Sequence, residues 1–150
     1  MANTELSADW LTQHIRDNIP LAYMMQFEIV DLQENAIAVA APLAPNINIH
    51  GTGFAGSLYA LAVLTSWGLT SAIVLESGFK ADVVIAKAEI NYRKPVDSEI
   101  KCVCLCSQEA KSTFINTLQN KAKGRLLLTV KIGDSDEAIL KASMVAIKQS

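Results

Sequence analysis

Strong charge of either sign is missing from this sequence. Its 13 Lys and Arg and 15 Asp and Glu leave a formal net charge of -2 over 150 residues, and the basic residues are scattered along the chain. Proteins that bind nucleic acid usually carry a basic patch or stripe. The sequence therefore predicts no nucleic-acid partner, while a small anionic ligand held by two or three cations stays possible.

Cysteine is scarce as well, with three residues at positions 102, 104 and 106. In an extended strand such side chains share one face about 7 Å apart, which is wide for one zinc ion with thiolates about 2.3 Å away. No further cysteine could complete a metal site or a disulfide framework. We therefore expect small buried side chains in a reducing, cytoplasmic compartment, with no metal and no cofactor.

Targeting signals are weak in the sequence. Residues 1–7 contain no basic segment that leads into an apolar one, so we expect no signal peptide. Residues 51–75 hold no charged side chain and are long enough to span a bilayer. This stretch also contains Thr, Ser and Gly, and the remaining amphipathic segments need a core. We expect a buried helix of a soluble protein, without a membrane partner.

The length and the 51% content of hydrophobic residues fit one globular domain covering residues 1–150. Helical spacing, alternation and turn residues predict its elements. In chain order these are a helix at 7–18 that Ser7 caps and Pro20 ends, strands at 24–33 and 36–42, a helix at 54–75, and strands at 84–92, 99–109, 126–132 and 138–146.

The alternation is one-sided in each later strand. In the first of them, the side chains of Val84, Ala86, Ala88, Ile90 and Tyr92 are predicted to share a face. Such a pattern is typical of an antiparallel sheet with one dry face. Since the 54–75 helix is the element apolar enough to cover that face, the sequence predicts an α+β protein of the hotdog fold. In it, a long central helix is wrapped by an antiparallel sheet of five to six strands.

The segment from Asn46 to Ser57 concentrates polar side chains and glycines at the entrance of the buried helix. First-turn amides of a helix lack internal partners and carry the positive end of its dipole. Gly56 leaves its amide unobstructed, with Ser57 beside it, so these amides can bind a carbonyl oxygen and stabilise an oxyanion. Asn48 and His50 could orient a water or a carbonyl. Alternatively, the Asn and His side chains cap turns and strands, and the glycines only satisfy backbone geometry.

The stretch N-x-N-x-H-G-T-G-F-A-G-S-L, followed by Trp67-Gly68, resembles the thioesterase-like domain at the C-terminus of YiiD-type proteins, a branch of the hotdog-fold thioesterases. The similarity runs from about Phe27 to Ile147 and includes the element Asn91-Tyr92-Arg93-Lys94-Pro95-Val96. This resemblance implies hydrolysis of an acyl thioester, with coenzyme A as the expected carrier. It also implies a homodimer or a dimer of dimers whose sheets join edge to edge, with the site at the interface.

On this resemblance, the expected site combines side chains and backbone amides from several segments. Thr65 and Ser66 are the nearest polar helix residues that could hold a water, although their hydroxyls can instead bond back to the preceding turn. Surface solubility explains the basic candidates for coenzyme phosphates equally well. The catalytic candidates are Asn48, His50, Gly56, Ser57, Thr65 and Ser66, and the substrate-binding candidates are Asn46, Phe54, Lys80, Arg93 and Lys94.

The sequence departs from the better-understood hotdog thioesterases on the helix. The position that often bears a catalytic Asp or Glu falls on Val63, and no carboxylate precedes Glu76. A general base would then have to come from elsewhere, for instance from a partner subunit. Two alternatives therefore stay open: a non-catalytic module that binds acyl groups or coenzyme A or only dimerises, and a hydratase or dehydratase, which needs a His paired with a carboxylate.

Overall fold

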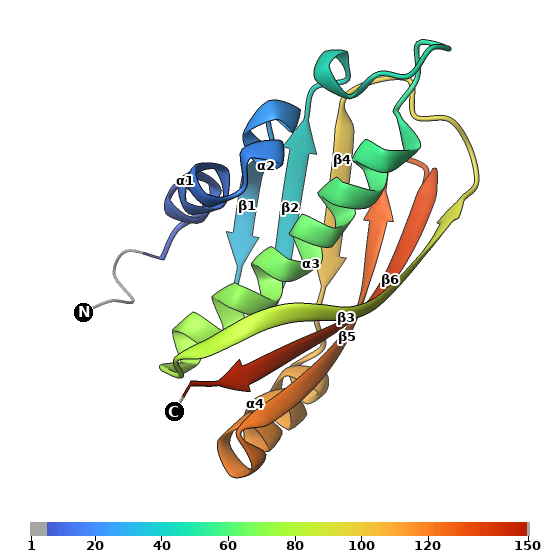
Figure 1. Ribbon diagram of the computed structural model, residues 1–150. Coiled ribbons are helices and arrows are strands. Elements are labelled where there is room, and N and C mark those ends of the chain that lie inside the picture. Colours follow the sequence, from blue (N-terminus) through green and yellow to red (C-terminus); the bar gives the residue numbers. More distant parts are fainter. Residues whose placement is uncertain (1–5, 150) are drawn as a thin grey trace.

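In the computed structural model, which describes residues 6–149, a sheet of six strands curls around one long helix (Figure 1). The expectation of no signal peptide rests in part on residues 1–5, which lie outside the described residues. The predicted α+β arrangement is confirmed. The elements are α1 (Ala8–Asn18), α2 (Pro20–Met25), β1 (Glu28–Gln33), β2 (Ala36–Ala41), η2 (Ala44–Asn46), α3 (Ala55–Ser77), β3 (Ala81–Tyr92), β4 (Ile100–Leu105), α4 (Gln108–Lys121), β5 (Lys123–Ile132) and β6 (Ala138–Lys148).

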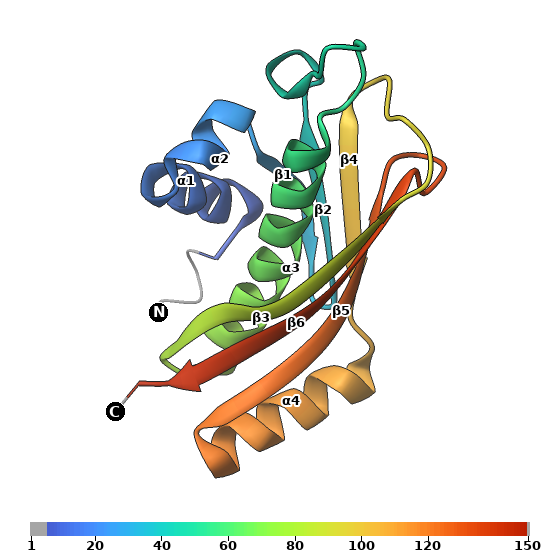
Figure 2. The same cartoon turned by 45° about the vertical axis from the view of Figure 1, so that its right-hand side comes forward.

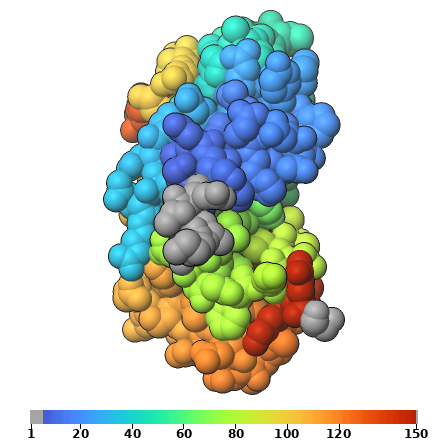
Figure 3. All heavy atoms as spheres, turned by 90° about the vertical axis from the view of Figure 1, so that its left-hand side faces the viewer, coloured from blue at the N-terminus to red at the C-terminus, as the bar shows by residue number. Residues whose placement is uncertain are grey.

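The strands pair in the order β1-β2-β4-β5-β6-β3, and every neighbouring pair is antiparallel. The sheet is strongly curved and holds α3 against its inner face (Figure 2). Strands β1 and β3 form its two edges, so one side of the long β3 has no partner within the described chain. Figure 3 shows the α1–α2 segment in blue lying across one side of the molecule, with the α4 segment in orange below it.

Helix α3 is the core of the fold. Leu61, Ala62 and Leu69 are completely buried, because the helix lies against β2, β3, β4, β5 and β6. By length and composition α3 could cross a membrane, yet 72% of its most apolar window is buried inside the fold. Such burial is typical of the core helix of a soluble protein, as the sequence predicted.

Cys102 and Cys104 in β4 and Cys106 directly after it are all buried, and none forms a disulfide. Burial raises the pKa of the Cys102 and Cys104 thiols to about 12, so both remain neutral thiols near neutral pH. The prediction that these residues serve as small apolar core side chains is confirmed. Across residues 6–149, no group of three His, Cys, Asp or Glu side chains is arranged to hold a metal ion.

Two predicted strands are longer than the observed ones, because part of each predicted range is helical. The 24–33 strand is wrong at its start: Pro20 opens α2, where its missing amide costs nothing, and β1 begins at Glu28. The 99–109 strand is wrong after Leu105, because the Ser107 hydroxyl accepts a bond from the Ala110 amide at 3.1 Å and caps α4. The sequence predicts no element for residues 110–119 and a turn at residues 120–124, so most of α4 was not predicted.

Strand β3 contains a β-bulge that the alternation did not reveal. Ile85 pairs with Met144 and Lys87 pairs with Ser143, so one extra residue stands between them. The predicted common face of Val84, Ala86, Ala88, Ile90 and Tyr92 is therefore wrong. Val84, before the bulge, is on the outer face and 46% exposed, whereas Ala88 and Ile90 pack against the core.

Candidate functional site

The first turn of α3 leaves backbone donors open. Its N-cap residue, Phe54, offers no side-chain bond, and the first ladder bond runs from the Leu58 amide to the Phe54 carbonyl at 3.0 Å. The amides of Ala55, Gly56 and Ser57 therefore lack helix partners, as the first amides of a helix do. No acidic side chain occupies this turn. The helix dipole and these donors together favour a negative or partly negative oxygen at this point.

The Phe54 ring lies against Gly56. A Cβ atom added at Gly56 would stand 2.5 Å from the ring carbon Cε2, closer than side chains pack. The ring itself is 53% exposed, so nothing in the described fold fixes it from the outside. Glycine at position 56 thus lets an aromatic side chain lie beside the open amides.

Backbone bonds attach the preceding loop to the rest of the fold. The Phe54 amide donates to the Asn46 carbonyl at 2.7 Å, and the Gly53 amide donates to the Val96 carbonyl at 2.7 Å. Ile47 and Gly53 also form an isolated antiparallel bridge. The loop is therefore closed on itself just before it enters α3.

Asn48 organises the tip of this loop with its side chain. Its Oδ1 atom accepts bonds from the His50 amide at 2.9 Å and the Thr52 amide at 3.0 Å, while Nδ2 donates to the Thr52 hydroxyl at 3.0 Å. These bonds match the turn-capping alternative considered for this residue. His50 lies at the exposed tip, and among residues 6–149 its ring makes no hydrogen bond.

Asn46 anchors the other end of the loop. It is 1% exposed, and its Nδ2 atom donates to the carbonyls of Met25 and Pro42, both at 2.9 Å. Its Oδ1 atom is buried without a partner in the described part of the chain. Asn46 therefore connects the end of α2 to the helix entrance rather than facing solvent.

The hydroxyls of Thr65 and Ser66 are used inside the helix. Both residues are completely buried; Thr65 Oγ1 donates to the Leu61 carbonyl at 2.7 Å, and Ser66 Oγ donates to the Val63 carbonyl at 2.8 Å. This is the back-bonded geometry that the sequence left as the alternative. Neither hydroxyl is brought to the first turn of α3.

The three basic candidates lie at two different places. Arg93 and Lys94 follow β3 directly, are exposed, and both donate their amides to the Glu137 carbonyl at 2.8 and 3.0 Å. Lys80 precedes β3, beyond the opposite end of the 23-residue helix α3, which measures roughly 35 Å. A single chain therefore brings Arg93 and Lys94, but not Lys80, to the end of the fold that holds Gly56.

The sequence predicted that Tyr92 lies on the inner face of its strand, but it did not predict the hydrogen bond that its hydroxyl makes. The Tyr92 hydroxyl donates to the Ala55 carbonyl in the first turn of α3 at 2.8 Å. Burial, and then the nearby Tyr59 phenol, raise the pKa of Tyr92. The one indication in the sequence that Tyr92 matters was its position in the Asn91–Val96 element. The sequence alone does not show which residue of the helix Tyr92 contacts.

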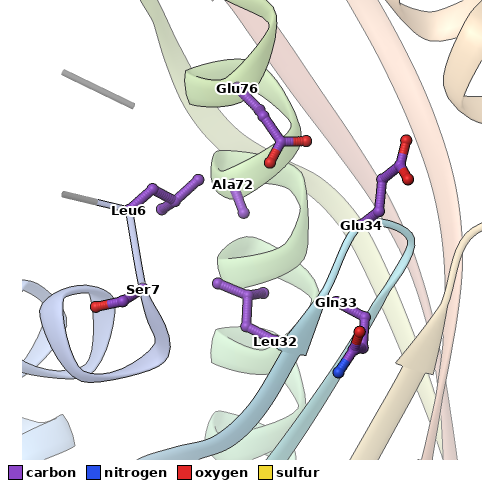
Figure 4. Close-up of a pocket in the computed structure, with 7 residues that line it drawn as sticks. All are labelled: Leu6, Ser7, Leu32, Gln33, Glu34, Ala72 and Glu76. Carbon is purple, nitrogen blue, oxygen red and sulfur yellow. The ribbon is translucent and has the colours of Figure 1, made fainter. Parts of the chain in front are cut away.

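A separate cavity of about 250 Å³ lies near the C-terminal end of α3. Figure 4 shows Glu34 and Glu76 at one end of it and Leu32 with Leu6 at the other. Glu34 is paired with the Lys111 ammonium at 3.5 Å. The cavity contains none of the residues that the sequence singled out, so it does not coincide with the helix entrance.

Both the sequence and the fold of the chain are similar to those of known proteins. A family model described as "Putative thioesterase (yiiD_Cterm)" matches residues 8–144. A structure described as the putative thioesterase from Shewanella oneidensis shares 31% identity, covers 93% of this chain and 96% of its own, and superposes with a TM-score of 0.85. A protein of unknown function from Chlorobaculum tepidum TLS shares 26% identity over 97% of this chain and 99% of its own, with a TM-score of 0.91. A thioesterase from Haemophilus influenzae, at 15% identity, 95% and 92% coverage and a TM-score of 0.72, shows the common fold.

Proposed function

Because the chain belongs to the thioesterase family of YiiD C-terminal domains, we propose that it hydrolyses acyl thioesters and that acyl-coenzyme A is its substrate. The observation that carries the proposal is the set of open amides at the first turn of α3, next to Gly56. Charge develops on the carbonyl oxygen when a thioester is attacked. Donors that are already oriented toward that oxygen stabilise the transition state more than the ground state.

In the proposed reaction, the thioester carbonyl oxygen lies at the Gly56 and Ser57 amides. Water adds to the carbonyl carbon and the oxyanion forms at these donors. The C–S bond then breaks, leaving a carboxylic acid and the free thiol of coenzyme A. The apolar surfaces of α3 and the inner sheet hold the acyl chain, and Asn46 and Phe54 border the site.

His50 is the side chain that we assign to the attacking water. Histidine is the side chain that most often acts as a general base in enzymes, and the His50 ring is exposed. Asn48 acts on His50 through the loop, because its Oδ1 atom accepts the His50 amide. The buried hydroxyls of Thr65 and Ser66 have no part in this scheme.

We also propose a homodimer, or a dimer of dimers, that forms along the edge strand β3. An edge of 12 residues presents a row of unpaired backbone groups that another strand can complete. Antiparallel pairing of two copies would place the start of β3 from one copy beside its end from the other. Lys80 of one copy would then join Arg93 and Lys94 of the other in binding coenzyme phosphates. The three free cysteines support a cytoplasmic location.

A second candidate is a non-catalytic module that binds acyl groups or coenzyme A. It is favoured by Val63, which stands where a carboxylate would be expected, and by the absence of a carboxylate on α3 before Glu76. A hydratase or dehydratase is less well supported, because the same helix offers no carboxylate to pair with a His.

The test is the release of free thiol from acyl-coenzyme A esters of increasing chain length, with the wild type, His50→Ala and Asn48→Ala. We expect turnover by the wild type and a loss of about 100-fold or more in kcat for His50→Ala, the usual range for a removed general base. The matched control is His14→Ala, whose ring stacks on Trp10 in α1 at 4.9 Å between centroids. Measurable binding without turnover would instead support the binding module, and full activity in both loop variants would remove His50 and Asn48 from the mechanism.

A further inference from the structure

Tyr92 joins the end of β3 to the entrance of α3. Its hydroxyl donates to the Ala55 carbonyl at 2.8 Å, across 37 positions in the sequence. The side chain is 46% exposed, so the contact lies at the rim of the fold rather than in the core. A rim contact of this kind adds little to the packing of the protein, and its effect is concentrated on the turn that it touches.

The first turn of α3 has few other restraints. Phe54 contributes no capping bond, and the tethers at Gly53 and Phe54 act on the backbone before the helix begins. Within residues 6–149, Tyr92 is the one side chain that hydrogen-bonds to any residue from Ala55 to Ser57. Helix ends open locally at low free-energy cost, so a restraint at this carbonyl limits fraying where the open amides lie.

We propose that Tyr92 is a positioning residue for the carbonyl-binding amides: by holding the Ala55 carbonyl, it keeps the Gly56 and Ser57 amides oriented. This inference rests on the proposed thioesterase function. Burial and Tyr59 raise the pKa of Tyr92 above its usual 10.0, so the phenol keeps its proton and remains a donor at neutral pH. Because the hydroxyl donates its hydrogen to the Ala55 carbonyl, we assign it no direct contact with the substrate.

A positioning role for Tyr92 predicts a change in kcat without a change in KM. Ground-state binding of an acyl-coenzyme A ester depends mostly on contacts far from the first turn. Stabilisation of the oxyanion depends on the orientation of a few amides. Loss of the Tyr92 hydroxyl should therefore lower kcat and leave KM nearly unchanged, which is the pattern of a contact that matters in the transition state.

The experiment compares the wild type with Tyr92→Phe, which keeps the ring and removes the hydroxyl. We expect kcat to fall about tenfold, KM to stay within about twofold, and Tm to fall by no more than about 2 °C. Hydrogen exchange is measured in parallel at the Leu58 and Tyr59 amides, which close the first ladder bonds of α3 and should exchange faster. Tyr23→Phe is the matched control, because the Tyr23 ring is 65% exposed on α2 and its hydroxyl has no bond in the described part of the chain.

The outcomes separate this inference from the proposed function. An active wild type with unchanged kcat in Tyr92→Phe overturns the positioning role, as does a rise in KM at constant kcat. A wild type that hydrolyses no thioester overturns the proposed function instead. In that case the exchange measurement decides on Tyr92: faster exchange confined to Leu58 and Tyr59 supports the restraint, and unchanged exchange overturns it.

Discussion

At its first turn α3 leaves the Gly56 and Ser57 amides without partners, whereas at its last turn the chain provides donors for the Val74 and Leu75 carbonyls. There, Gly78 adopts a left-handed conformation with φ of 87°, and its amide donates to the Leu75 carbonyl at 3.2 Å. The Ser77 hydroxyl donates to the Val74 carbonyl at 2.6 Å. This closure is the usual way to satisfy the last carbonyls of a helix.

The difference shows how one helix can serve two purposes. The last turn has donors from the chain itself for the Val74 and Leu75 carbonyls, so its contacts contribute to stability. The first turn is held in place from outside, by the Asn46 loop and by Tyr92, and keeps its donors open. Its open donors are therefore available for binding without unfolding any part of the chain.

The largest expected effect comes from Gly56→Ala, which tests whether the first turn is functional. The added Cβ would meet the exposed Phe54 ring at 2.5 Å and crowd the space in front of the amide. We expect kcat/KM for acyl-coenzyme A to fall by about 100-fold, the usual cost of an impaired oxyanion donor, while the urea midpoint changes little. Activity within threefold of the wild type would contradict the assignment of this turn.

Asn46→Ala should have the next largest effect, on stability. The substitution leaves the buried Met25 carbonyl and the partly buried Pro42 carbonyl without their donor and frees the loop from α2. We expect a loss of about 2 kcal/mol in the free energy of unfolding, from two hydrogen bonds of about 1 kcal/mol each. Urea denaturation measures it. Asn18→Ala is the control, because that exposed side chain bonds within its own helix, and an equal loss there would contradict the anchoring role of Asn46.

Gly78→Ala should have the smallest effect and sharpens the contrast between the two ends. No atom lies within 4 Å of an added Cβ, so the cost comes from the positive φ alone. We expect a loss of about 1 kcal/mol in the free energy of unfolding. The value of kcat/KM per folded molecule should stay within twofold of the wild type. Thiol release from acyl-coenzyme A, together with urea denaturation, checks both statements, and a large loss of activity would show that the two ends are not independent.

The sheet could be predicted where alternation and burial agree. Leu126, Leu128, Val130 and Ile132 follow a strict period of two and are all buried on β5. Helix α4 gave a much weaker pattern, since its fully buried side chains are Phe114 and Leu118 among mostly polar residues. The clearest indication of α4 in the sequence is Ser107, a good N-cap residue, but this position falls inside the predicted 99–109 strand.

The geometry of the candidate site could be predicted from the sequence only in part. The charge-free helix and its glycine-rich entrance located the open amides at Gly56 from sequence. The bonds of Asn48 depend on how the loop closes, because its partners are two backbone amides and the Thr52 hydroxyl within a few residues. The alternation predicts Tyr92 on the same face as Ala88 and Ile90, but its contact with Ala55 depends on how the end of β3 lies against α3, which the apolar pattern does not record.

The bulge in β3 divides the strand into two halves of opposite phase. In the first half, odd-numbered side chains such as Val83 turn toward α3; in the second half, even-numbered ones such as Ile90 do. An unbroken phase from Val83 onward would turn Asn91 inward and the Tyr92 phenol outward. The single inserted residue thus determines which side chains in the second half of β3 face α3. Deletion of the residue inserted at the bulge, Ala86, would give a regular strand whose side chains keep their faces, because Ile85, Lys87 and Ala88 already pair in order with β6. Deletion of a residue between Lys87 and Tyr92 would instead exchange the faces of the residues that follow it in β3.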